Sequence, residues 1–61
     1  MKHVEIIKLA MAEKNISQSE LSRKTGMNQS NLSLFLNGKR PASLKNIEKM
    51  FQVLDINFVI N

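Results

Sequence analysis

Apolar side chains recur every three or four residues along most of this chain, which is the spacing of one face of an α-helix. The first such stripe is formed by Val4, Ile7 and Met11. It predicts a helix near residues 2–14, and Asn15 can end that helix in the left-handed conformation. Ile6 and Leu9 lie off the stripe, so we expect a second face of this helix to be covered by the C-terminal segment or by a partner.

Two more helix-start patterns flank Gly26. In the first, Ser17 and Glu20 form a capping box, in which the serine oxygen accepts from a backbone amide and the glutamate reaches back to the serine amide. Ile16 and Leu21 add the hydrophobic staple that fixes the angle at which the chain enters the helix. A short helix is therefore predicted to begin after Ser17.

The second pattern follows Gly26 directly. Asn28 is a strong N-cap, and Met27 and Leu32 form its hydrophobic staple. Glycine adopts the left-handed conformation without a Cβ penalty, so Gly26 makes the corner between two short helices. Residues 17–37 therefore predict a helix-turn-helix.

A loop and another helix complete the helical part of the chain. Gly38 can end the second short helix and Pro41 cannot continue it, so residues 37–42 are expected to form a loop. Ser43 caps an amphipathic helix that runs from Leu44 to about Val53. Its apolar stripe is Leu44, Ile47, Phe51 and Leu54.

The last residues change from helical spacing to alternation, which favours a β-strand. The apolar members of this pattern are Ile56, Phe58 and Ile60. Because no other segment predicts a strand, this one pairs with its symmetry copy in a homodimer, or packs as irregular chain on Ile6 and Leu9; we favour the dimer. The predicted fold is all-α: one compact domain over residues 1–61 with four to five helices. Its dimerisation segment is residues 55–61, which in the arrangement we favour form a short C-terminal β-strand that pairs across the dimer.

Length and composition limit the size of the core and the kinds of site and location that fit the chain. Sixty-one residues allow one marginal core, so help from a second copy is plausible. The absence of cysteine excludes disulfides and thiolate metal sites and fits a reducing, cytoplasmic location. The start of the sequence shows no small-residue cleavage site, and no apolar run approaches the ~20 residues of a membrane span, so we expect a soluble protein with no membrane partner.

Positive charge gathers in the middle of the chain. The formal net charge is +4, which alone does not decide between nucleic-acid binding and a solvated face. Every charged residue between Leu21 and Ile47 is basic, however, and all five acids lie outside that stretch. The basic residues are Arg23, Lys24, Lys39, Arg40 and Lys45. A positive field on and after the two short helices favours a nucleic-acid partner.

The second short helix carries a polar face without an acid. At about 100° per residue, one arc of about 140° holds Gln29, Ser30, Ser33, Leu34 and Asn37. Leu32 and Phe35 lie on the opposite side of the helix. Amides and hydroxyls read base edges, and Leu34 suits a thymine methyl. The candidate base-reading residues are Gln29, Ser30, Ser33 and Leu34.

A second set of residues suits the DNA backbone. Gln18 lies in the first turn of its helix, where free amides and the helix dipole favour a phosphate. Arg23 and Lys24 are equally well explained as solvated charges. The candidate phosphate-binding residues are Ser17, Gln18, Asn28, Asn37, Lys39 and Arg40.

These residues resemble the DNA-binding domain of phage Cro and cI-type repressors, the XRE-like helix-turn-helix family. The resemblance covers Ile7 to Leu54. The matching positions are Ile16, Ser17, Gln18, Leu21, Ser22, Gly26, Asn28, Leu32 and Asn37 to Pro41, followed by Leu44 and Ile47. It implies that Gln18 binds phosphate, that the base-reading residues face the major groove, and that Asn37, Lys39 and Arg40 hold the backbone.

Two departures accompany the resemblance. Family members often join an Arg of the first helix to a Glu near the end of the reading helix, but Met11 and Leu36 occupy these positions here. Since replacing both ends of a buried ion pair by apolar residues is often neutral or stabilising, we predict that Met11 and Leu36 are in contact. The alternating tail is similar to that of antitoxin-type relatives whose C-terminal strands pair across a dimer.

The sequence thus favours a sequence-specific double-stranded DNA-binding transcriptional regulator, a repressor acting as a homodimer on a palindromic operator. The alternative is an antitoxin-type protein-binding module with autoregulatory DNA binding, whose protein partner is a toxin or an antirepressor. We expect no enzyme, cofactor or metal site. His3 is the sole imidazole and there is one Asp, so neither a catalytic triad nor a credible metal cluster can be assembled.

Overall fold

A computed structural model describes residues 2–56, and within this range every regular element is an α-helix. The helices are α1 (Lys2–Lys14), α2 (Gln18–Thr25), α3 (Gln29–Leu36) and α4 (Leu44–Val53). The all-α class and the predicted starts of all four helices are confirmed. Of the predicted C-terminal strand, Ile56 lies in irregular chain, and Phe58 and Ile60 lie outside the described residues.

Each helix boundary has a local cause. Asn15 ends α1 with a φ of 55°, and Gly26 ends α2 with a φ of 77°, both in the left-handed region. Ser17 Oγ accepts the Glu20 amide at 3.1 Å, as the capping box requires. The return bond of that box is absent from the described hydrogen bonds, because the Glu20 carboxylate turns to Lys24 Nζ at 3.5 Å.

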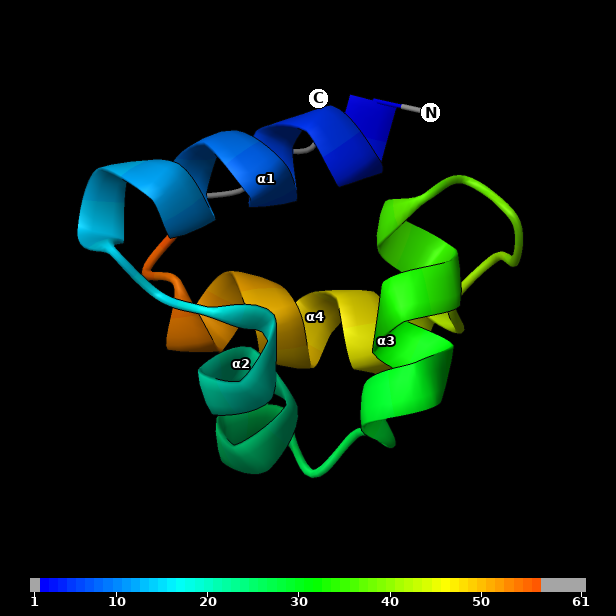
Figure 1. The fold of residues 1–61 in the computed structure, drawn as a ribbon. Helices are drawn as coiled ribbons and strands as arrows, with labels where there is room; N and C mark the ends of the chain where they lie inside the picture. The colour runs from blue at the N-terminus through cyan, green and yellow to red at the C-terminus, as the bar shows by residue number, and fades with distance from the viewer. Residues whose placement is uncertain (1, 57–61) are drawn as a thin grey trace.

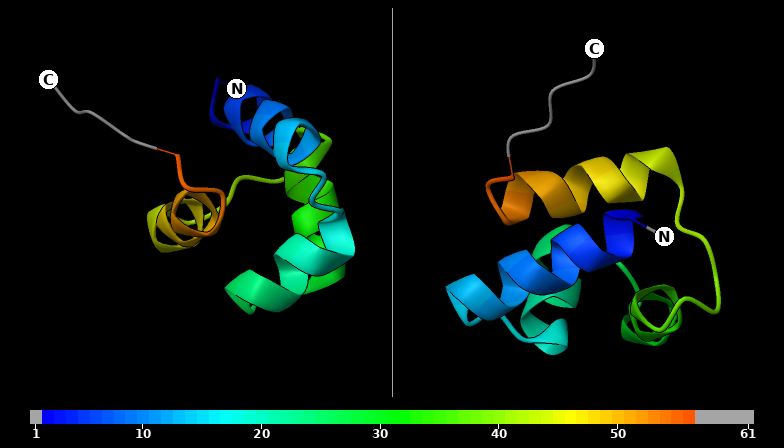
Figure 2. Two further views of the ribbon diagram at one scale, coloured as in Figure 1. Left: turned by 90° about the vertical axis from the view of Figure 1, so that its left-hand side faces the viewer. Right: turned by 90° about the horizontal axis from the view of Figure 1, so that it is seen from above.

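The four helices enclose a single core (Figure 1). The second helix packs on α3 and α4, while α1 lies across α3 and α4. In the view of Figure 1, α1 runs along the top and α4 passes behind the α2–α3 pair. The turned views of Figure 2 show α1 and α4 as separate helices, with α3 running steeply relative to both. The outer sides of α2 and α3 therefore remain open to a partner.

The predicted apolar stripes form the core, with one exception. Its buried members are Val4, Ile7, Met11, Leu21, Leu32, Phe35, Leu36, Met50, Phe51 and Leu54. Leu44 was predicted on the inner stripe of α4 but is 70% exposed, and Met50 is fully buried instead. Leu44 is the first residue of α4, so it lies at the very end of the stripe.

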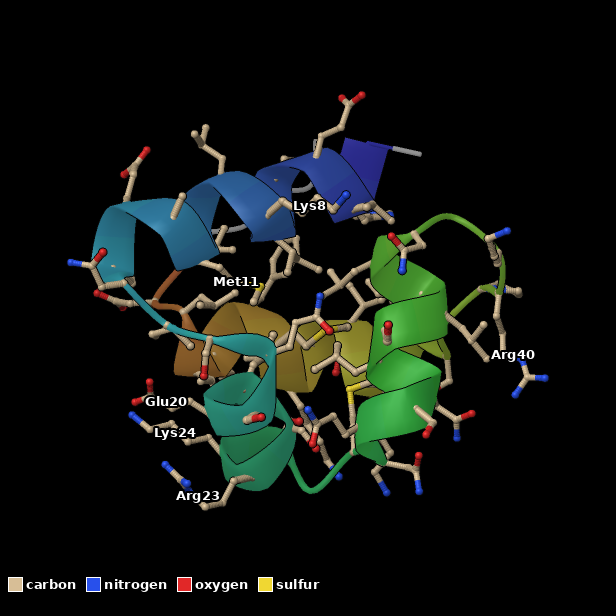
Figure 3. All side chains as sticks on the ribbon, viewed as in Figure 1. Lys8, Met11, Glu20, Arg23, Lys24 and Arg40 are labelled. Atoms are coloured by element: carbon tan, nitrogen blue, oxygen red, sulfur yellow. The ribbon has the colours of Figure 1, made fainter. Side chains whose placement is uncertain are left out.

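Met11 and Leu36 both belong to this core. Met11 is 8% exposed and points from α1 into the interior (Figure 3). Two apolar side chains thus occupy the positions where relatives often carry an ion pair. By contrast, Ile6 and Leu9 are 41% and 62% exposed, so no helix of residues 2–56 supplies the cover that the sequence predicts for them.

The turn between α2 and α3 is held by two side chains of α2. Thr25 is 6% exposed, and its Oγ1 donates to Leu21 O at 2.7 Å and accepts the Met27 amide at 3.3 Å. Ser22 Oγ donates to the Met27 carbonyl at 2.5 Å. Both polar groups of the Met27 backbone are therefore bound to α2, which fixes the direction in which α3 leaves the turn.

Candidate nucleic-acid interface

The predicted base-reading residues lie together on the outer side of α3. Gln29 and Ser30 are exposed, while Ser33 and Leu34 are half-buried. All four line one shallow, open concavity, and Gln18 from the first turn of α2 completes it. The arc drawn from helical spacing is thus one continuous surface, and it joins the start of α2.

Burial of the opposite side of α3 fixes this orientation. Leu32, Phe35 and Leu36 are each at most 2% exposed and contribute to the core. Asn28 caps the helix, its Oδ1 accepting the amides of Ser30 and Asn31 at 2.9 and 3.3 Å. Rotating α3 to present another face would remove three large apolar side chains from the core, at a cost of roughly 1.5–3 kcal/mol each.

One base-reading side chain is tied to the neighbouring helix. The Gln29 Nε2 donates to Ser19 Oγ at 2.9 Å, and both residues are exposed. Sequence reasoning did not assign a role to Ser19, because the two residues are ten positions apart and meet only where α2 and α3 approach. A hydroxyl in the second position of a capped helix was the one available signal.

The C-terminal end of α3 is closed by Asn37. Its Nδ2 donates to Ser33 O at 2.9 Å and lies 3.4 Å from Ser33 Oγ. Its backbone amide also donates to Ser33 O. Asn37 was predicted to bind phosphate; in this structure its amide nitrogen satisfies a carbonyl at the helix end.

The loop after α3 brings Arg40 back to the helix. Arg40 Nη1 donates to Asn31 Oδ1 at 2.9 Å, across nine residues of sequence. Figure 3 shows Arg40 on the side of α3 away from α2. Lys39 is exposed in the same loop. Asn31 was not predicted as a site residue because it lies outside the polar arc and its role depends on the path of the loop.

The basic residues of α2 lie on its outer side. Figure 3 shows Arg23 and Lys24 there, on the opposite flank of the domain from Arg40. Lys24 pairs with Glu20, an exposed i, i+4 contact worth well under about 1 kcal/mol. The cations therefore flank α3 on two sides, whereas α3 itself has no charged residue.

Two of the predicted phosphate ligands also act as caps. Ser17 Oγ and Asn28 Oδ1 both accept backbone amides of the helices that they begin. Each retains a donor, the serine hydroxyl and the asparagine Nδ2, which suits an anionic oxygen.

Within the described range, no three His, Cys, Asp or Glu side chains are grouped so that they could hold a metal ion. None of the four helices of residues 2–56 is long and apolar enough to cross a membrane.

A family model described as helix-turn-helix matches residues 7–60, which is most of the chain and includes the whole of α2, α3 and α4. No curated protein and no solved structure gives a significant match.

Proposed function

The chain belongs to the Cro/cI-like helix-turn-helix family of DNA-binding transcription regulators, and we propose that it is a repressor that recognises a specific double-stranded DNA sequence as a homodimer. The observation that carries the proposal is the open concavity shared by Gln18 and the outer face of α3. It joins neutral groups suited to base edges with a helix start suited to phosphate.

In this proposal α3 enters the major groove and reads bases with Gln29, Ser30, Ser33 and Leu34. The groove admits an α-helix, and the amide, hydroxyl and leucine side chains match its donors, acceptors and thymine methyls. A face without acids avoids repulsion from phosphate. The rigid placement of α3, with three residues in the core, holds these side chains in register.

The grip on the backbone comes from residues around α3. Ser17 and Gln18 start α2, Asn28 starts α3, and Asn37, Lys39 and Arg40 follow it. Each phosphate neutralised by a cation such as Lys39 or Arg40 contributes about −0.9 to the slope of log affinity against log salt concentration. We therefore expect binding to weaken steeply as salt rises.

The homodimer is supported by an apolar pocket beside α4. It has a volume of about 300 Å³ and is lined by His3, Leu44, Ile47, Glu48, Phe51, Gln52 and Ile56. Ile56 is the first residue of the proposed dimerisation pattern, which continues with Phe58 and Ile60 in segment 55–61. Two copies joined there would present two α3 helices to half-sites about one DNA turn apart.

Selection of bound duplexes from a random pool tests recognition and symmetry together. We expect enrichment of a palindromic site, bound by two copies when the complex is sized. A Phe58→Asp, Ile60→Asp variant should bind a single half-site weakly while keeping the helical fold. Specific DNA binding would be refuted if no motif were enriched, or if the affinity for DNA did not change with salt concentration. A single asymmetric site bound by one copy would refute the dimer.

Repression is tested with a reporter whose promoter carries the selected site. We expect the wild-type chain to lower expression and the Gln29→Ala variant to restore it. Increased expression with the wild-type chain would refute the repressor role and leave DNA recognition standing.

A further inference from the structure

The hydrogen bond between α2 and α3 reaches a residue that is proposed to read a base. Gln29 Nε2 donates to Ser19 Oγ at 2.9 Å. We propose that Ser19 is a positioning residue that sets the orientation of the Gln29 amide, so that the chain reads adenine at this position. This inference rests on the proposed DNA-binding function and adds to it a residue that positions one of the base-reading side chains.

The chemistry of the amide makes its orientation matter. To read adenine in the major groove, a glutamine accepts from the adenine N6 amino group with Oε1 and donates to N7 with Nε2. The amide nitrogen carries two hydrogens. In this structure one of them goes to Ser19, so the second is left for N7, and Oε1 is left for N6. The bond to Ser19 is therefore compatible with the full bidentate contact.

The hydroxyl proton of Ser19 decides which of the two Gln29 amide orientations is favoured. A hydroxyl can accept from an amide nitrogen or donate to an amide oxygen, so the pair alone permits both amide orientations. In the hydrogen bonds described for residues 2–56, the Ser19 hydroxyl accepts from Gln29 and is a donor in none. Ser19 adjoins Gln18, a proposed phosphate ligand in the first turn of α2. A phosphate oxygen that takes the hydroxyl proton leaves Ser19 only as an acceptor, which selects the Nε2-facing orientation.

The bond also prepares Gln29 before DNA arrives. A glutamine side chain on a surface samples several rotamers about its three rotatable bonds, and binding must pay to order them. Ser19 restrains this side chain in the free protein. Removing the hydroxyl should therefore weaken discrimination at one base pair more than it weakens binding overall.

The test compares base preferences of four proteins: wild type, Ser19→Ala, Ser19→Thr and Gln29→Ala. Each is titrated with the selected duplex and with its single-base-pair variants at every position. The base pair whose preference disappears in Gln29→Ala is the one that Gln29 reads. We expect an A·T pair, favoured in the wild type by about 5- to 150-fold.

At that pair, Ser19→Ala should reduce the preference by about 2- to 10-fold, the effect of one hydrogen bond. Ser19→Thr keeps the hydroxyl and should restore the preference. In a Gln29→Ala background, Ser19→Ala should change discrimination no further. The matched control is Gln18→Ala, from the same helix turn, which should lower affinity evenly for all duplexes.

Three results would overturn the inference while leaving the proposed function intact. The first is a non-A·T pair at the Gln29 position. The second is an unchanged preference in Ser19→Ala, and the third is an even loss of affinity with every duplex, as for a simple phosphate contact. Failure of the wild type to select any duplex would instead refute the proposed function itself. Since Ser19 is exposed and alanine favours helices, the variant remains folded.

Discussion

Replacing Thr25 by valine should loosen the turn on which the DNA-reading geometry depends. Thr25 Oγ1 is the acceptor for the Met27 amide at 3.3 Å, and it also donates to Leu21 O at 2.7 Å. Valine has nearly the same shape, so Thr25→Val leaves no cavity in a site that is 6% exposed. The substitution therefore isolates the hydroxyl.

The expected cost follows from the groups left without partners. The Leu21 carbonyl still accepts its helical bond, so it is not orphaned. The Met27 amide loses its acceptor, and an unsatisfied buried donor costs about 1–3 kcal/mol. Because Met27 is half-buried, we place the loss at about 1–2 kcal/mol. For a domain of this size that lowers Tm by roughly 4–16 °C.

The assay is thermal and urea unfolding followed by circular dichroism, at one protein concentration because dimer formation shifts apparent stability. Ser19→Ala is the matched control: it removes an exposed hydroxyl from the same helix and should stay within about 0.5 kcal/mol of wild type. Ser22→Ala tests the second bond to Met27 and should couple with Thr25→Val by about 0.5 kcal/mol or more. A Thr25→Val protein as stable as the wild type would refute the assignment of Thr25 as the support of the turn.

Two pairs of substitutions probe the core and the contacts with the DNA backbone. Met11→Arg alone should lower the free energy of unfolding by about 3–5 kcal/mol, because it buries an unpaired charge. Adding Leu36→Glu should recover part of that loss, as measured by urea unfolding. A double variant no more stable than Met11→Arg would show that the two side chains do not face each other. Arg40→Ala should reduce the salt-dependence slope of DNA binding by about 1 for every duplex, while Asn31→Ala should keep the slope, since it frees the guanidinium without removing its charge. An unchanged slope in Arg40→Ala, measured by fluorescence anisotropy, would remove Arg40 from the phosphate contacts.

The helices could be located from the sequence because their signals are local. Ser17, Asn28 and Ser43 each accept an amide two or three residues ahead, and Gly26 adopts a positive φ at the end of α2. Such contacts depend only on the neighbouring chain. Leu44 was misplaced because helical spacing identifies a face, whereas burial at the end of that face depends on which helix reaches it.

In the candidate site, too, the features set by local sequence could be predicted and those set by the packing of distant segments could not. The outer arc that includes Gln29 was predictable, since it follows from 3.6 residues per turn and an apolar opposite side. The partners Ser19 and Asn31 were not, because their hydrogen bonds join residues ten and nine positions apart. Those bonds depend on the crossing of α2 and α3 and on the path of the loop. At Asn37 a local contact competes with the predicted phosphate contact, because its side-chain amide donates to the carbonyl four residues earlier.

The distribution of charge separates recognition from attraction in this domain. The reading helix α3 is uncharged, whereas Arg23 and Lys24 on α2 and Lys39 and Arg40 in the loop after α3 provide positive charge on its flanks. Salt screens the attraction between cations and phosphate but has little effect on neutral hydrogen bonds in a desolvated groove. Under the proposed function, the flanks set how tightly any DNA is held, and α3 sets which DNA is preferred. Substitutions within α3 can therefore change the preferred operator while the flanking cations preserve the salt-dependent grip.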